Sequence, residues 1–502
     1  MERRLVRRTF LRQSGFAALA ASSIASLAQT QTPAGSRAAQ PGNRKSSAPS
    51  LSRQFARWVA GLRYEDLPPA VIDRAKGLTL QAVSSVLLGY QLPAGKEAVT
   101  LITEEEAGVR KGASIMVNGG KATKGGAAYA NAEMALAGGK WDTFRMLTHP
   151  GTCIVPAAFA AAEAEGASGK DFITGLVAGY EVMERMAADF IPTVMARGFH
   201  AGPVFGIFGA AVAAAKITHL AEDQVNNAIG LCTNLAASNL ESGGLREGGA
   251  ARNALLAVAL AKLGHRGGET ALEGNAGFYN AYAGNNQGRL TYSFTGEKQV
   301  RLDTITANLG KEWMLLETLY RIYSISGYNI AHIDVTAKLC EEHNIQYADV
   351  DRVEAVVNWL ETQYPSPAFP NLREDIGEPA RGSTRYYAAY GVVKRGFAML
   401  PFQDDPPEVL ELMKRVTIIP SHEMTLFGPR ITIFTKDGKS YTKQATGREF
   451  IWDFNEEARR IRGIVPGIPI PATQYEEIVA TCRDLDQQSR ADKLVELTLR
   501  KS

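Results

Sequence analysis

Hydrophobic residues recur with a helical period from residue 51 onward. Phe55, Val59 and Leu62 fall at positions i, i+4 and i+7, which places them on one face of a helix. The same pattern predicts further helices over residues 71–88, 126–138, 155–165, 170–186, 204–217, 221–237, 250–263 and 270–282. Many of their residues are Ala or Gly, which lets helix backbones approach closely. The pattern therefore predicts a large all-helical domain over residues 51–309.

The pattern changes near residue 310. Strand-like runs occur within residues 349–360 and over residues 415–419, 430–434 and 440–443, and helical runs over residues 333–340 and 385–395. Asp437-Gly438 lies between the last two strands and is a strong hairpin signal. Residues 310–449 are therefore expected to form a smaller α+β domain. Helical periodicity returns over residues 475–485 and 490–499, so residues 450–502 are expected to pack back on the helical domain. The predicted fold class is mainly α.

The N-terminus has the features of an export signal. Arg7 and Arg8 begin a twin-arginine pattern that is followed by an apolar run and a small-residue cleavage site ending at Ala28. The apolar run is shorter than the roughly 20 residues of a membrane span. Residues 1–28 are therefore predicted to be a twin-arginine signal peptide and residues 29–50 a disordered linker, with a periplasmic destination. The alternative is a cytosolic protein with an incidentally basic N-terminus.

Charge and cysteine content exclude several classes of protein. The net charge is +3 at pH 7, but the first 28 residues hold five arginines against one glutamate, which leaves the rest of the chain at −1. The charge therefore gives no reason to expect a nucleic-acid partner. The four cysteines are too far apart for a local zinc or iron–sulfur motif, and no nucleotide, flavin or metal motif occurs. We expect no cofactor and no metal.

Two histidines precede helices that are rich in small residues. Pro150 disfavours the α conformation at His149, so His149 should lie extended beside the start of the next helix. His200 stands in the same position before the helix that begins near Val204. The first turn of a helix has unpaired N–H groups that suit a carboxylate, and an imidazole ionises near neutral pH. The histidines could flank one ligand; alternatively, they are two unrelated loop residues.

Three strings resemble the MmgE/PrpD family, which includes 2-methylcitrate dehydratase, cis-aconitate decarboxylase and iminodisuccinate epimerase. They are THPGTCIVPAAFAAAEAEGASGKDFITGLVAGYEV, GFHAGPVFGIFGAAVAAAK and TALEGNAGFYNAYAG. The resemblance runs from about residue 51 to the C-terminus. It implies an all-helical domain, an α+β lid, a homodimer, and cofactor-free chemistry on small di- and tricarboxylic acids in a cleft between the domains.

The site residues that the resemblance implies are partly kept. His149 and His200 match two active-site histidines, Thr143 matches a threonine of the preceding loop, and Tyr387 matches a lid tyrosine. Asp142 keeps one of the family's loop aspartates, while the first aspartate of that loop is replaced by Gly139.

Other positions depart from the family pattern. Gly243 replaces the active-site lysine, and Arg246 takes the place of a neighbouring histidine. In the lid, Arg321 keeps a positive charge, whereas the catalytic histidine corresponds to Ser326 or Tyr328. Losing a general acid or base typically lowers a rate roughly 10²–10⁴-fold, so the binding pocket can persist while the reaction differs or fails. Both arginines also have a plain alternative as solvated surface residues.

The sequence therefore predicts a cofactor-independent lyase, a dehydratase or decarboxylase, that acts on a small di- or tricarboxylic acid such as 2-methylcitrate or cis-aconitate. The catalytic residues would be His149, His200 and Tyr387. The substrate-binding residues would be Asp142, Thr143, Arg246 and Arg321. The alternatives are an isomerase or epimerase of a small dicarboxylate, and a non-catalytic carboxylate-binding protein on the same scaffold.

Overall fold

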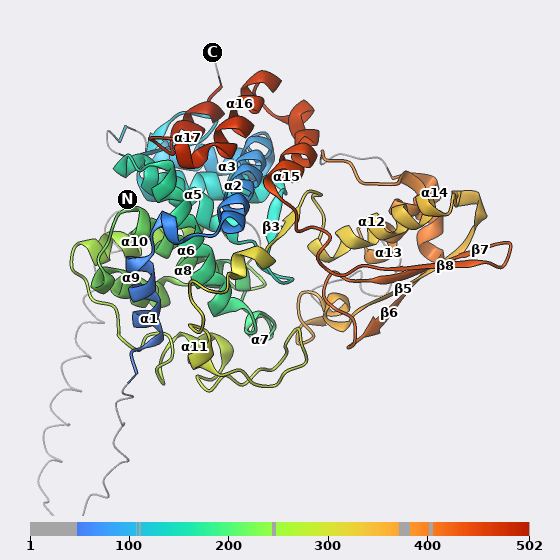
Figure 1. Ribbon diagram of the computed structural model, residues 1–502, viewed down its shortest axis with the longest axis horizontal. Helices are drawn as coiled ribbons and strands as arrows, with labels where there is room; N and C mark the ends of the chain where they lie inside the picture. Colours follow the sequence, from blue (N-terminus) through green and yellow to red (C-terminus); the bar gives the residue numbers. More distant parts are fainter. Residues whose placement is uncertain are drawn as a thin grey trace, which may run out of the picture. The chain divides into compact units, whose positions relative to one another are not determined.

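A computed structural model of the protein describes residues 48–106, 108–109, 112–242, 247–370, 382–400 and 405–500 (Figure 1). The predicted signal peptide and nearly all of the predicted linker lie outside these residues. The described residues from 49 onward belong to one compact unit. Among the described residues, no helix combines the length and the apolar character that crossing a lipid bilayer requires.

Helices make up the larger part of this unit, as predicted. The helices of the first part are Leu51–Gly61 (α1), Pro69–Gly89 (α2), Pro93–Glu105 (α3), Lys124–Gly138 (α4), Pro150–Glu165 (α5), Gly169–Ala187 (α6), Ile191–Met195 (α7), Ala201–Ile217 (α8), Glu222–Leu235 (α9), Glu247–Lys262 (α10) and Phe278–Ala283 (α11). A short hairpin, Ala113–Ser114 (β1) with Lys121–Ala122 (β2), precedes α4.

The small residues of α8 explain why the helices pack so closely. Every residue of this helix except Lys216 is buried, and α5, α6 and α10 all pack against it. A Cβ atom at Gly209 would lie 2.5 Å from the Ile154 side chain and 2.9 Å from the Gly179 carbonyl oxygen of α6. Larger residues would push these backbones apart.

Most predicted helices differ from the observed ones by only one to three residues at each end. The helix predicted over residues 270–282 is wrong in extent, because only Phe278–Ala283 is helical. Before it the chain makes tight turns around Gly274 and Gly277, residues that favour turns over helix. Helix α5 begins earlier than predicted, at Pro150, because proline fits the first helical position, where no hydrogen bond from its nitrogen is needed.

The second part is an α+β layer with its own core. Strands Val350–Asn358 (β5), Val416–Ser421 (β6), Arg430–Thr435 (β7) and Ser440–Gln444 (β8) form a sheet of order β6-β5-β7-β8, in which only β5 and β6 are parallel. The predicted hairpin at Asp437-Gly438 joins β7 to β8. Helices Gly327–Glu342 (α12) and Thr384–Lys394 (α13) pack on the sheet, with Pro407–Leu412 (α14) beside α13 (Figure 1).

The C-terminal helices return to the first part of the chain. They are Phe454–Ile461 (α15), Ala472–Arg483 (α16) and Lys493–Thr498 (α17), and α15 and α16 pack against α2 (Figure 1). The Tyr475 hydroxyl lies 2.8 Å from the Ser84 hydroxyl in the core. The domain boundaries after residues 309 and 449 remain predictions.

A small strand pair, which the sequence pattern did not predict, joins the helical part to the α+β part. Trp141–Thr143 (β3) pairs antiparallel with Leu319–Arg321 (β4). Trp141 lies opposite Arg321, although the two residues are far apart in the chain. This pair places the loop before α5 directly beside the segment that leads into α12.

Candidate active site

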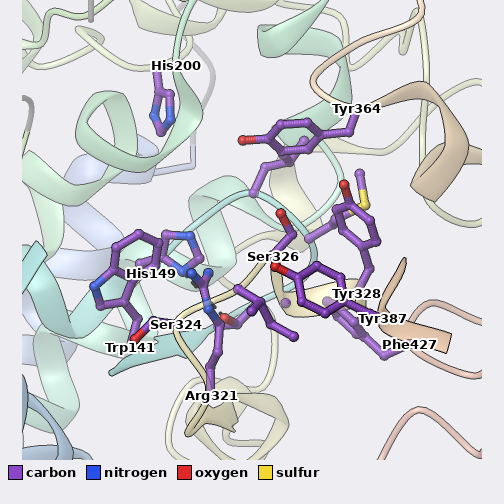
Figure 2. A pocket seen from close by; sticks show the side chains of 15 residues that line it. Trp141, His149, His200, Arg321, Ser324, Ser326, Tyr328, Tyr364, Tyr387 and Phe427 are labelled. Atoms are coloured by element: carbon purple, nitrogen blue, oxygen red, sulfur yellow. Dashed lines mark hydrogen bonds between the residues drawn. The ribbon is translucent and has the colours of Figure 1, made fainter. Parts of the chain in front are cut away.

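A cavity of about 370 Å³ lies where the helical part meets the α+β part (Figure 2). Its lining residues come from both parts: Trp141, Thr143, Met146, Leu147, His149, His200, Arg321, Ser324, Ile325, Ser326, Gly327, Tyr328, Tyr364, Tyr387 and Phe427. The volume is in the range of small-molecule sites. Five of the residues predicted from the sequence are therefore brought together here: Thr143, His149, His200, Arg321 and Tyr387.

His149 is held by the backbone of the preceding strand. It is the residue before α5, with φ −132° and ψ 74°, so it is extended as predicted. Its Nδ1 atom lies 2.9 Å from the Asp142 carbonyl oxygen and 3.4 Å from Thr143 Oγ1. Because a carbonyl oxygen only accepts hydrogen bonds, Nδ1 carries a proton and donates it. Nε2 is then the nitrogen that can accept a proton.

Asp142 was predicted to bind substrate, but it does not line the cavity. Its side chain is 3% exposed and accepts hydrogen bonds from the Tyr180 hydroxyl at 2.6 Å and from the Gly151 backbone N–H at 2.8 Å. Burial raises the pKa of Asp142 to about 6. The carboxylate thus fixes the start of α5, and with it His149, from the side that faces away from the cavity. A loop position in the sequence does not tell which side of the strand a carboxylate faces.

Arg321 brings a positive charge into the cavity. Its guanidinium stacks 4.0 Å above the Trp141 ring, and that ring also lies against the His149 imidazole, with 4.5 Å between centroids. Burial lowers the pKa of Arg321 to about 9, which leaves it charged at pH 7. Among the described residues no carboxylate forms an ion pair with it, and its Nε atom is buried without a hydrogen-bond partner. A carboxylate ligand would satisfy this group.

His200 approaches the cavity from another side (Figure 2). It is the residue before α8, and Glu247 is the first residue of α10. A Cβ atom at Gly202 would meet both the Glu247 carboxylate, at 2.9 Å, and the His200 ring, at 3.3 Å. The glycine therefore leaves room for a buried carboxylate beside the imidazole. Sequence analysis missed Glu247, because nothing in the chain signals this neighbour.

Tyrosines form the wall on the α+β side of the cavity. Tyr328 of α12, Tyr364 and Tyr387 of α13 face His149 and Trp141 across the space (Figure 2). The phenol groups of all three lie close enough to Arg321 to affect its pKa. Their hydroxyls provide hydrogen-bond donors for an anionic ligand.

The positions predicted to replace the lid histidine are also in the wall. Ser326 precedes α12 and Tyr328 is its second residue. His332, one turn further along α12, is fully buried and does not line the cavity. Arg246 and Gly243 lie outside the described residues, so the place of the predicted second arginine is not described.

Lys140 is a cation near the cavity that sequence analysis missed. It lies between α4 and β3, is 1% exposed, and its Nζ atom donates a hydrogen bond to Ser324 Oγ at 2.8 Å. Burial, together with the charge of Arg321, lowers the pKa of Lys140 to about 7. The signal available in the sequence was a lone lysine between glycine and tryptophan, which does not distinguish a buried amine from an exposed one.

The chain is similar to known proteins along most of its length. The chain is 26% identical to the cis-aconitate decarboxylase-like protein oryM of Aspergillus oryzae over 420 residues, which cover 78% of this chain and 85% of that protein. It is 24% identical to a cis-aconitate decarboxylase of Aspergillus terreus, over 78% of this chain and 84% of that protein. It is 25% identical to the cis-aconitate decarboxylase of Homo sapiens, over 79% and 83%. Residues 53–291 match the MmgE/PrpD N-terminal domain. Through this domain and these relatives, the chain is similar to the MmgE/PrpD family.

Proposed function

We propose that the protein is a cofactor-independent lyase that acts on a small di- or tricarboxylic acid. One observation carries the proposal: His149, His200 and the ion-pair-free guanidinium of Arg321 converge on one cavity, although they come from distant parts of the chain. The relatives named as cis-aconitate decarboxylases support the substrate class. Cis-aconitate and 2-methylcitrate are the first substrates to test.

The geometry supports different roles for the residues of the cavity. Arg321 grips one carboxylate through two parallel hydrogen bonds and holds the substrate against the tyrosine wall. His149 Nε2 exchanges a proton with the substrate, since the opposite nitrogen is fixed by the Asp142 carbonyl. His200 or Tyr387 is the second proton carrier. Decarboxylation needs one acid to protonate the carbon that loses CO2; dehydration needs a base at carbon and an acid at the leaving hydroxyl.

Epimerisation is the second candidate. It requires two proton carriers on opposite faces of one carbon, and the approach of His149 and His200 from different sides of the cavity favours it (Figure 2). Product chirality separates the two reactions: an epimerase inverts a stereocentre, whereas a lyase releases water or CO2. A non-catalytic binder would be stabilised by the acids without changing them.

His149 is expected to carry a proton in the reaction. Replacement His149→Gln removes the proton carrier, so turnover of the accepted acid should fall roughly 10²–10⁴-fold. Proton NMR in deuterated water, with cis-aconitate and 2-methylcitrate, measures turnover and deuterium incorporation together. The matched control is His219→Gln, since His219 is an exposed histidine at the end of α8.

The outcomes separate the alternatives. A wild-type protein that neither converts these acids nor incorporates deuterium, yet melts at a higher temperature in their presence, is a binding protein and not a lyase. An unchanged rate in the His149→Gln variant would remove His149 from the reaction.

A further inference from the structure

Lys140 and Ser324 are positioned to act together. We propose that they form a proton-carrying pair in the cavity wall, in which Ser324 Oγ contacts a carboxylate of the ligand and Lys140 holds the proton and the charge behind it. The inference rests on the proposed polycarboxylate ligand, but not on any turnover of that ligand. Lys140 would thus be a positioning residue that acts through Ser324.

The amine of Lys140 is buried, whereas the hydroxyl of Ser324 is exposed. Lys140 Nζ donates to Ser324 Oγ at 2.8 Å and makes no ion pair with any described residue. Ser324 is exposed and lines the cavity, whereas Lys140 is buried and does not. A space of only about 10 Å³ lies on the inner side of Lys140, room for about one water molecule. The hydroxyl is therefore the amine's route to the ligand.

Gly139 makes this contact sterically possible. It ends α4 with a φ of +72°, a conformation that favours glycine. A Cβ atom there would lie 2.6 Å from Ser324 Oγ and 2.9 Å from Ser324 Cβ. A side chain at residue 139, such as the aspartate that the family pattern has, would displace Ser324. The Lys140–Ser324 hydrogen bond therefore depends on glycine at residue 139.

The surroundings of Lys140 favour proton exchange near neutral pH. From β4 it faces the charge of Arg321, and from β3 Asp142 borders the same small space. Asp142 is already held by Tyr180 and Gly151, and the His149 ring lies against Trp141. The part of α2 next to Lys140 contributes uncharged side chains only, of which Ser85 Oγ accepts from the Lys140 backbone N–H at 3.0 Å.

The proton can then move without a net change at Ser324. In the charged form, the ammonium donates to Ser324 Oγ, and the hydroxyl proton is free to point to a ligand carboxylate. When Oγ takes a proton from Nζ, it passes its own proton to the ligand, and the neutral amine remains. Burial and Arg321 hold the pKa of Lys140 at about 7. An anion at Ser324 favours the charged amine, so binding should draw a proton from solution above that pH.

The test is proton uptake on binding, which needs no catalysis. Isothermal titration calorimetry with cis-aconitate at pH 8, in buffers that differ in ionisation heat, gives the number of protons taken up. We expect Lys140→Met and Ser324→Ala to lose the part of the proton uptake that is due to Lys140. Both variants should also bind cis-aconitate at least tenfold more weakly. Lys140→Arg, which stays charged, should lose the uptake but keep most of the affinity. Lys311→Met, at an exposed lysine, is the matched control.

The outcomes are distinguishable from those for the lyase. Binding with Lys140-dependent proton uptake and no turnover would uphold the pair and reject the lyase. Equal proton uptake in the wild type and in Ser324→Ala, the variant at the exposed position, would overturn the pair, as would an absence of cis-aconitate binding. Circular dichroism of each variant confirms that it is folded before it is compared.

Discussion

At the scale of single residues, the site depends on groups that never touch the cavity. The Asp142 carboxylate fixes the start of α5 by accepting a hydrogen bond from Gly151 N–H. Its backbone carbonyl oxygen determines that Nδ1 is the protonated nitrogen of His149. Gly139 and Gly202 act by having no side chain, which lets Ser324 and Glu247 take their places. Residues such as these three affect a reaction by orienting the groups that contact the ligand.

Asp142→Ala should lower both stability and turnover. It leaves the Tyr180 hydroxyl and the Gly151 N–H buried without an acceptor, which costs about 1–3 kcal/mol in the free energy of unfolding. Urea unfolding measures this loss. Tyr180→Phe removes one of the two hydrogen bonds and should cost about 1 kcal/mol. Equal stability of Asp142→Ala and the wild type would show that the carboxylate does not hold α5.

At the scale of elements, helix termini and short strands deliver the functional side chains. His149 and His200 each precede a buried helix, and β3 with β4 brings Trp141 under Arg321. Helix α12 carries Tyr328 to the cavity with its first turn and buries His332 with its second. Among the described residues, neither ring nitrogen of His332 has a hydrogen-bond partner.

His332 should make the stability depend on pH. Burial lowers its pKa to about 3 in the folded protein, against about 6.5 in an unfolded chain. Between these values only the unfolded chain binds the proton, so the free energy of unfolding falls as the pH drops from 6.5 towards 3, by up to about 1.4 kcal/mol per pH unit. His332→Leu should remove this slope, as urea unfolding at several pH values will test.

A control in the same helix separates proton binding from packing. Leu339→Ala should lower the stability by about 2–5 kcal/mol, because it empties a buried position, but by the same amount at every pH. Parallel pH curves for the wild type and His332→Leu would contradict the prediction.

At the scale of the whole molecule, the cavity exists because two differently built parts meet. The helices place the histidines, the α+β layer places the tyrosines, and the C-terminal helices return to cover α2. All four cysteines are buried and free. A chain that folds with free thiols suits an export route that carries folded proteins, and we propose that residues 1–28 direct the protein to that route.

Export should depend on the two arginines of the leader. Replacing both Arg7 and Arg8 with lysine should retain the protein in the cytoplasm, whereas Arg3→Lys in the same leader should not. Cell fractionation followed by immunoblotting measures the distribution. Equal periplasmic amounts of the double variant and the wild type would reject the twin-arginine route. Light scattering of the purified protein gives its mass, and this tests the homodimer that the family resemblance implies.

The sequence by itself determined the features that depend on local order. The helical period, the hairpin at Asp437-Gly438 and the position of His149 and His200 before small-residue helices all follow from neighbouring residues. The tertiary structure alone decided which distant side chains meet. Trp141 with Arg321 and Lys140 with Ser324 are each about 180 residues apart, and a residue's type does not reveal which partner it faces or whether it is buried. Burial and long-range contacts lower the pKa of Lys140 to near neutral pH, and they make Asp142 a structural residue that holds the start of α5. Both effects arise only in the packed interior.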